Sequence, residues 1–132
     1  DVGIDFSHAK ENTKSHSHKS LGQLADYPSF NQIEKNLKSI VASNPKISKM
    51  FSIGKSVKGR DLYVVKISDN VEIDELEPEF KYISSMHGNE ITGRELTQFL
   101  IRDLVNGYGK DPKITSLINN TEIFIMVSMN PD

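Results

Sequence analysis

Two residues with the types and spacing of metal ligands are His87 and Glu90, which lie three positions apart. A neutral imidazole nitrogen and a carboxylate both bind Zn²⁺ at about 2.0–2.2 Å. Gly88 keeps the segment between them small, so that both groups can converge on one ion. A His-x-x-Glu pair is a weak signal by itself, and its meaning depends on where the fold places it.

The rest of the chain offers no convincing third zinc ligand. A catalytic zinc ion usually has three protein ligands and one water. The remaining histidines, His8, His16 and His18, all lie in the polar first segment, where a solvated tail is the simpler interpretation. The chain has no Cys, which excludes a thiolate zinc site, an iron–sulfur cluster, a disulfide scaffold and cysteine-based catalysis. The spacing also differs from the His-Glu-x-x-His helix of thermolysin-like proteases.

Hydrophobic spacing predicts the elements that position the pair. A capping box at Ser29 and Gln32 starts a helix that ends at Asn44. A helix that starts at His87 carries a predicted buried stripe of apolar side chains, namely Leu96, Phe99, Leu100 and Leu104. The other predicted elements are a hairpin (47–55 and 61–68), an exposed acidic loop (69–78), strands at 80–86 and 123–127, and a short helix after Asp111.

A strand, a long helical crossover and a second strand predict an α/β sheet with parallel neighbouring strands and helices on both faces. The apolar strand 123–127 is expected to be central and covered on both faces. Functional sites in such sheets lie outside the carboxyl ends of the parallel strands. Two polar segments follow strand ends here: the one with His87 and Glu90, and Asn130-Pro131-Asp132.

Composition excludes several classes of protein. The 132 residues have a formal net charge of −2, which argues against a nucleic-acid or membrane-surface protein. No apolar run approaches the ~18 residues of a membrane span. Residues 1–26 are polar and aperiodic, and are predicted to form a mobile N-terminal arm. Because the chain opens with Asp1, we expect a removed signal peptide and a secreted or periplasmic protein.

Several separate motifs resemble the zinc metallocarboxypeptidases of the funnelin family, most closely their N/E-type regulatory subgroup. They are residues 77–83, the Met-His-Gly-Asn-Glu run at 86–90, residues 93–96, the hairpin at 53–62, and the Ser-Met-Asn-Pro-Asp run at 128–132. The resemblance covers residues 27–132. It implies a three-layer α/β/α fold with a mixed central sheet, of which this chain is the N-terminal portion.

The resemblance also implies individual roles. His87 and Glu90 match the first two Zn²⁺ ligands, and Asp132 matches a carboxylate that accepts a hydrogen bond from the zinc-bound imidazole. Asn89 stands where digestive members carry an Arg that contacts substrate. The third ligand, a His, and the general-base Glu are expected beyond Asp132, together with the residues that hold the substrate's C-terminal carboxylate. The rest of its own catalytic domain is therefore an expected partner.

The function implied is zinc-dependent removal of a C-terminal amino acid from peptides or proteins, with the subgroup's preference for Lys or Arg. The isolated chain is predicted to be inactive, because a ligand and the base are missing from it. Two alternatives stay open from the sequence. One is a small-molecule N-deacylase of the aspartoacylase or succinylglutamate-desuccinylase type, and the other is an inactive carboxypeptidase-like binding module.

Overall fold

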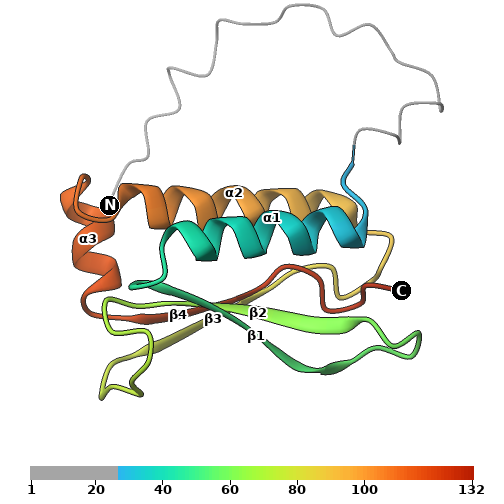
Figure 1. The fold of residues 1–132 in the computed structure, drawn as a ribbon, viewed down its shortest axis with the longest axis horizontal. Helices are drawn as coiled ribbons and strands as arrows, with labels where there is room; N and C mark the ends of the chain where they lie inside the picture. The colour runs from blue at the N-terminus through green and yellow to red at the C-terminus, as the bar shows by residue number, and fades with distance from the viewer. Residues whose placement is uncertain (1–26) are drawn as a thin grey trace, which may run out of the picture.

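The computed structural model describes residues 27–132, in which helices pack on a four-stranded sheet (Figure 1). The predicted arm at 1–26 lies outside the described residues. Helices and strands follow the predicted order closely. They are α1 (Phe30–Ser43), β1 (Ser48–Lys55), β2 (Asp61–Ile67), β3 (Glu79–Ile83), α2 (Ile91–Gly107), α3 (Pro112–Ile118) and β4 (Glu122–Met126).

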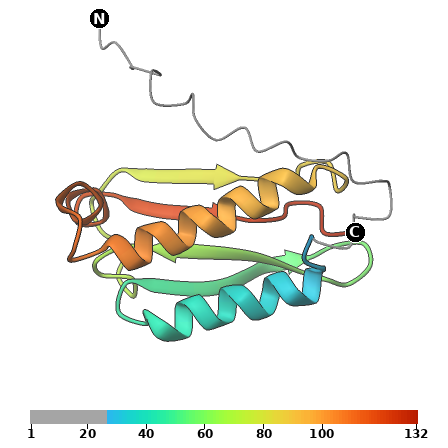
Figure 2. The same cartoon turned by 90° about the horizontal axis from the view of Figure 1, so that it is seen from above.

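The sheet is mixed, with strand order β1-β2-β4-β3. β1 pairs antiparallel with β2, β2 pairs antiparallel with β4, and β4 pairs parallel with β3. The helices α2 and α3 supply the crossover that a parallel pair requires. In Figure 2, α1 runs alongside β1 and α2 crosses β4. The predicted α/β class and mixed sheet are confirmed.

Short sequence motifs explain where α1 begins and where the chain turns between β1 and β2. The predicted capping box is present at α1, where the Ser29 amide donates to Gln32 Oε1 at 2.7 Å and Ser29 Oγ accepts from the Gln32 amide. The turn between β1 and β2 closes with a hydrogen bond from the Ser56 amide to the Arg60 carbonyl. Gly59 in that turn has φ +77°, a conformation that glycine adopts without a steric penalty.

The hydrophobic core lies between the helices and one face of the sheet. The side chains in it alternate along β2 and β4, so that every second residue of each strand points to the helices. Its buried members are Ile33, Leu37, Ile47, Val65, Ile67, Ile101, Leu104, Val105, Ile118, Ile123, Ile125 and Val127.

The predicted buried stripe of α2 is wrong for three of its four residues. Leu96 is 61% exposed, and Phe99 and Leu100 are exposed as well, whereas Leu104 is buried. The helix instead packs through Thr97, Gln98, Ile101, Leu104 and Val105. Apolar residues occur on two faces of α2, and at the start of the buried face Gly93 lies close to Ser84, the residue that follows β3.

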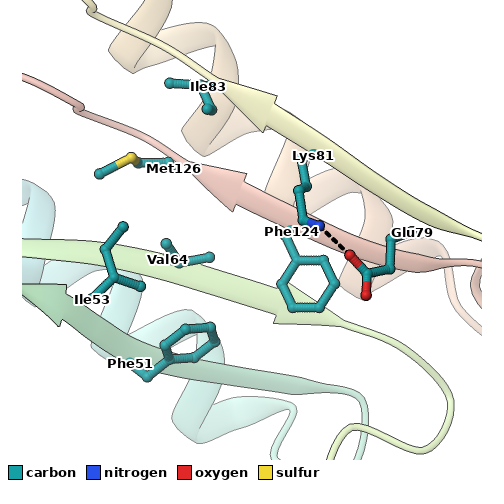
Figure 3. A pocket seen from close by; sticks show the side chains of 8 residues that line it. All are labelled: Phe51, Ile53, Val64, Glu79, Lys81, Ile83, Phe124 and Met126. Carbon is teal, nitrogen blue, oxygen red and sulfur yellow. Dashed lines mark hydrogen bonds and ion pairs between the residues drawn. The ribbon is translucent and has the colours of Figure 1, made fainter. Parts of the chain in front are cut away.

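The sheet face opposite the helices carries an open apolar groove of about 410 Å³ (Figure 3). Phe124 and Met126 of β4 point into it, while Ile123 and Ile125 point to the core. β4 is interior to the sheet, as predicted, but among the described residues only one of its faces is covered by helices (Figure 1). The described residues therefore provide two of the three predicted layers.

None of the helices within residues 27–132 combines the length and the apolar character needed to cross a bilayer.

The assignment of the α2 faces predicts different costs for two substitutions in this chain. Ile101→Ala is expected to lower the free energy of unfolding by about 2–5 kcal/mol, because it leaves a cavity in the core. Leu96→Gln, on the exposed face, is expected to change it by no more than about 0.5 kcal/mol. Urea unfolding followed by circular dichroism measures both, and a larger cost for Leu96→Gln would contradict the assignment.

Candidate metal centre

His87 and Glu90 lie together on the surface after β3. The His87 Nδ1 atom is 3.0 Å from Glu90 Oε1, and the two side chains are 73% and 60% exposed. Two ligands bound to one tetrahedral zinc ion lie about 3.3 Å apart. The pair therefore fits two positions of a zinc site, with its donor atoms facing solvent and further ligands still required.

A sharp turn after β3 places this pair, and it differs from the prediction. β3 ends at Ile83, before the predicted 86, and α2 begins at Ile91, after the predicted His87. Ser85 causes the difference, because its φ of +51° takes the chain out of the strand direction. Its Oγ then donates to the Glu90 carbonyl at 2.8 Å, which ties the strand end to the start of the helix.

Two glycines allow the turn and helix to sit close to the sheet. A Cβ atom on Gly93 would lie 2.4 Å from the Ser84 hydroxyl oxygen, so a larger residue would force that hydroxyl to rotate or α2 to move away. A Cβ atom on Gly88 would lie 3.1 Å from the Asn130 carbonyl oxygen. Gly93 thus permits the close packing of α2 on the end of β3.

The two polar strand ends lie side by side. The backbone of Ser84 donates to Met126 and accepts from Met129, both at 2.9 Å, and the Asn130 amide donates to the Ser85 carbonyl at 3.0 Å. These bonds extend the parallel pairing of β3 and β4 beyond their last strand residues. The His87 segment and the Asn-Pro-Asp segment therefore lie next to each other at the carboxyl ends of β3 and β4.

Asp132 has different partners from the predicted imidazole. Its carboxylate accepts from Ser56 Oγ at 2.7 Å and from the Lys58 amide at 2.9 Å, with the Arg60 guanidinium 3.8 Å away. The β1–β2 turn offers these donors directly, whereas the imidazole contacts Glu90. These hydrogen bonds hold the pKa of Asp132 below its usual value, first through Ser56 and then through the Lys58 amide.

Two further residues flank the pair. Asn89, the predicted substrate contact, is exposed between the two candidate ligands. Arg94, which sequence reasoning did not select, donates to the Gly88 carbonyl at 3.4 Å and so steadies the turn. The position of Arg94 in the first turn of the predicted helix, six residues after Gly88, could have indicated this contact.

Electrostatics keep the Glu90 carboxylate ionised. Its hydrogen bond with His87 lowers the pKa of Glu90, against a smaller opposing effect of desolvation. An ionised carboxylate beside an imidazole is the state that a zinc ion requires of these two ligands.

The sequence pattern of the family described as "Zinc carboxypeptidase" matches residues 33–132, which is most of the chain. This chain belongs to the zinc carboxypeptidase family. The membership predicted from the Met-His-Gly-Asn-Glu and Asn-Pro-Asp segments is confirmed, and both segments lie within the matched residues.

Known members of the zinc carboxypeptidase family are similar in sequence and in fold. The chain is 50% identical to human carboxypeptidase D over 104 residues, which is 78% of this chain and 8% of that protein. It is 48% identical to mouse carboxypeptidase M over 101 residues, 76% of this chain and 23% of that protein. The carboxypeptidase A structure from Helicoverpa armigera matches with a TM-score of 0.70 and 25% identity, over 80% of this chain and 25% of that one. The chain thus spans a small part of its relatives.

The close approach of α2 to the end of β3 predicts an unusual response to alanine. Alanine normally stabilises a helix relative to glycine by about 1 kcal/mol. Gly93→Ala is instead expected to destabilise the chain by about 1–3 kcal/mol, because the new methyl group meets the Ser84 hydroxyl. Adding Ser84→Ala, which removes that hydroxyl and keeps the Cβ atom, should recover most of that loss in urea unfolding. A Gly93→Ala variant that is more stable than the original would contradict the contact.

The partners of Asp132 predict a pH dependence of stability. Its folded-state pKa is lowered, so its contribution is complete above the unfolded value of ~3.9 and is lost as the pH falls through the folded value. Asp132→Asn should therefore destabilise the chain at pH 7 and leave stability unchanged near pH 2, by thermal unfolding at the two pH values. An equal loss of stability at both pH values would show that the charge of the Asp132 carboxylate does not contribute to folding.

Proposed function

We propose that the protein containing this chain is a zinc carboxypeptidase that removes the C-terminal amino acid of peptides, with His87 and Glu90 as two of its zinc ligands. One observation carries the proposal. In a chain of this family, the His87 Nδ1 and Glu90 Oε1 atoms lie 3.0 Å apart at the carboxyl end of a parallel strand. This edge of the sheet is where α/β folds place their sites.

The residues of this chain contribute two positioned ligands to the proposed site, one of which is charged. Zn²⁺, when bound, polarises the scissile carbonyl and lowers the pKa of the attacking water. His87 offers a ring nitrogen and Glu90 an ionised carboxylate, both on the turn that Ser85 and Arg94 support. A third His and a general-base Glu outside this chain complete the proposed site.

Two finer features belong to the proposal. Asn89, exposed between the ligands, would contact the substrate near the scissile bond. Asp132 would serve the zinc-bound imidazole only after exchanging its present contacts with the β1–β2 turn. A preference for C-terminal Lys or Arg, and a secreted or periplasmic location, stay predictions.

The metal mechanism predicts that a chelator abolishes activity in the intact protein. Release of the last residue from a peptide ending in Arg should stop when zinc is removed and return when zinc is restored. His87→Ala should lower kcat/KM by about a thousandfold or more, because a ligand is lost. His18→Ala, in the polar first segment, is the control and should have no effect. Activity retained in His87→Ala would contradict the proposal.

The same assays separate the rival functions. Hydrolysis of an N-acyl amino acid without peptide cleavage would indicate a deacylase. Peptide binding without turnover by the zinc-loaded protein would indicate a binding module.

For the isolated 132-residue chain, we expect no peptide turnover and zinc binding weaker than about 1 μM, because two ligands hold zinc poorly. Isothermal titration calorimetry measures the affinity. Tighter binding would show that this chain alone holds a complete site.

A further inference from the structure

Acidic side chains gather at the end of the sheet opposite His87. The loop between β2 and β3 meets the first residues of β3 and β4 there (Figure 1). One carboxylate oxygen each of Asp74, Glu79 and Glu122 lie within 4.8 Å of one another. Asp69, Glu75 and Glu77 form a second trio with the same spacing. The proposed zinc site does not involve any of these residues.

Glu122 provides the observation that separates this group from ordinary surface acids. Its side chain is only 1% exposed. The Lys66 ammonium contacts Oε1, while Oε2 has no hydrogen-bond partner among the described residues. A buried carboxylate oxygen without a donor is unfavourable, and native structures usually satisfy such atoms with a proton donor, a water or an ion.

Within residues 27–132, two lysines contact this group of three carboxylates. Lys66, 10% exposed, also donates to the Ile73 carbonyl at 2.7 Å, so its ammonium is shared. Lys81 contacts Glu79 beside the apolar groove, as Figure 3 shows. The group therefore has unmet negative charge.

We propose that Asp74, Glu79 and Glu122 bind a calcium ion. Calcium takes oxygen ligands at about 2.3–2.6 Å, so two ligands of one ion lie at most about 5 Å apart, as these oxygens do. A trio made only of carboxylates favours Ca²⁺ over zinc, which prefers nitrogen and sulfur. Asp74 and Glu79 are exposed and free to adjust, which suits the irregular coordination of calcium better than the strict octahedron of magnesium.

The ion would join the acidic loop to the sheet. Asp74 lies in the loop, while Glu79 and Glu122 begin two neighbouring parallel strands. A ligand that binds only the folded state raises the unfolding temperature. Calcium is thus assigned a structural role at this end of the sheet.

The test is a calcium titration of the intact protein after removal of free divalent ions, followed by calorimetry and by thermal unfolding. We expect saturable binding and a higher unfolding temperature. Asp74→Asn and Glu122→Gln should each weaken calcium binding by about tenfold or more. Glu72→Gln is the matched control, because Glu72 lies in the same loop but contacts Lys49.

Three results would overturn the site: no binding up to about 10 mM calcium, binding unchanged in Asp74→Asn, or equal weakening by Glu72→Gln. Asp74 is exposed, so its variant remains informative if Glu122→Gln fails to fold. His87→Ala should bind calcium normally. This readout keeps the calcium site independent of the proposed zinc site.

Discussion

The parallel pairing of β3 with β4 decides where the polar groups of the candidate metal centre lie. The register places Ile83 opposite Met126, and the backbone bonds of Ser84 and Ser85 continue it to Asn130. The register is itself fixed by the core, because a slip of one residue would turn the buried face of β4 to the open side of the sheet. Burial of apolar side chains therefore positions the His87 turn beside the Asn-Pro-Asp segment.

Much of this arrangement could be predicted from the sequence. Strong local signals, such as the Ser29 capping box and the apolar β4 run, specify elements that depend little on distant contacts. The meeting of His87 with Glu90 also follows from their spacing at a strand end. These features were predictable because the information for each lies within a few residues.

The features that the sequence analysis missed depend on tertiary contacts. α2 has two apolar faces, and the larger side chains of Leu96 and Phe99 suggested the wrong one. The stripe that packs on the sheet begins at Gly93, which lies close to Ser84, and continues through Thr97 and Ile101. The positive φ of Ser85 and the partners of Asp132 are likewise set by neighbouring segments. Side-chain size was therefore a poor guide to which of the two apolar faces of α2 is buried.

We propose that His87 and Glu90 hold zinc in the intact protein. Anomalous diffraction from its crystals, recorded on both sides of the zinc absorption edge, tests this most directly. We expect one strong zinc peak within about 2.0–2.2 Å of a His87 ring nitrogen and a Glu90 carboxylate oxygen. A zinc peak at another site, with these two side chains free of metal, would contradict it.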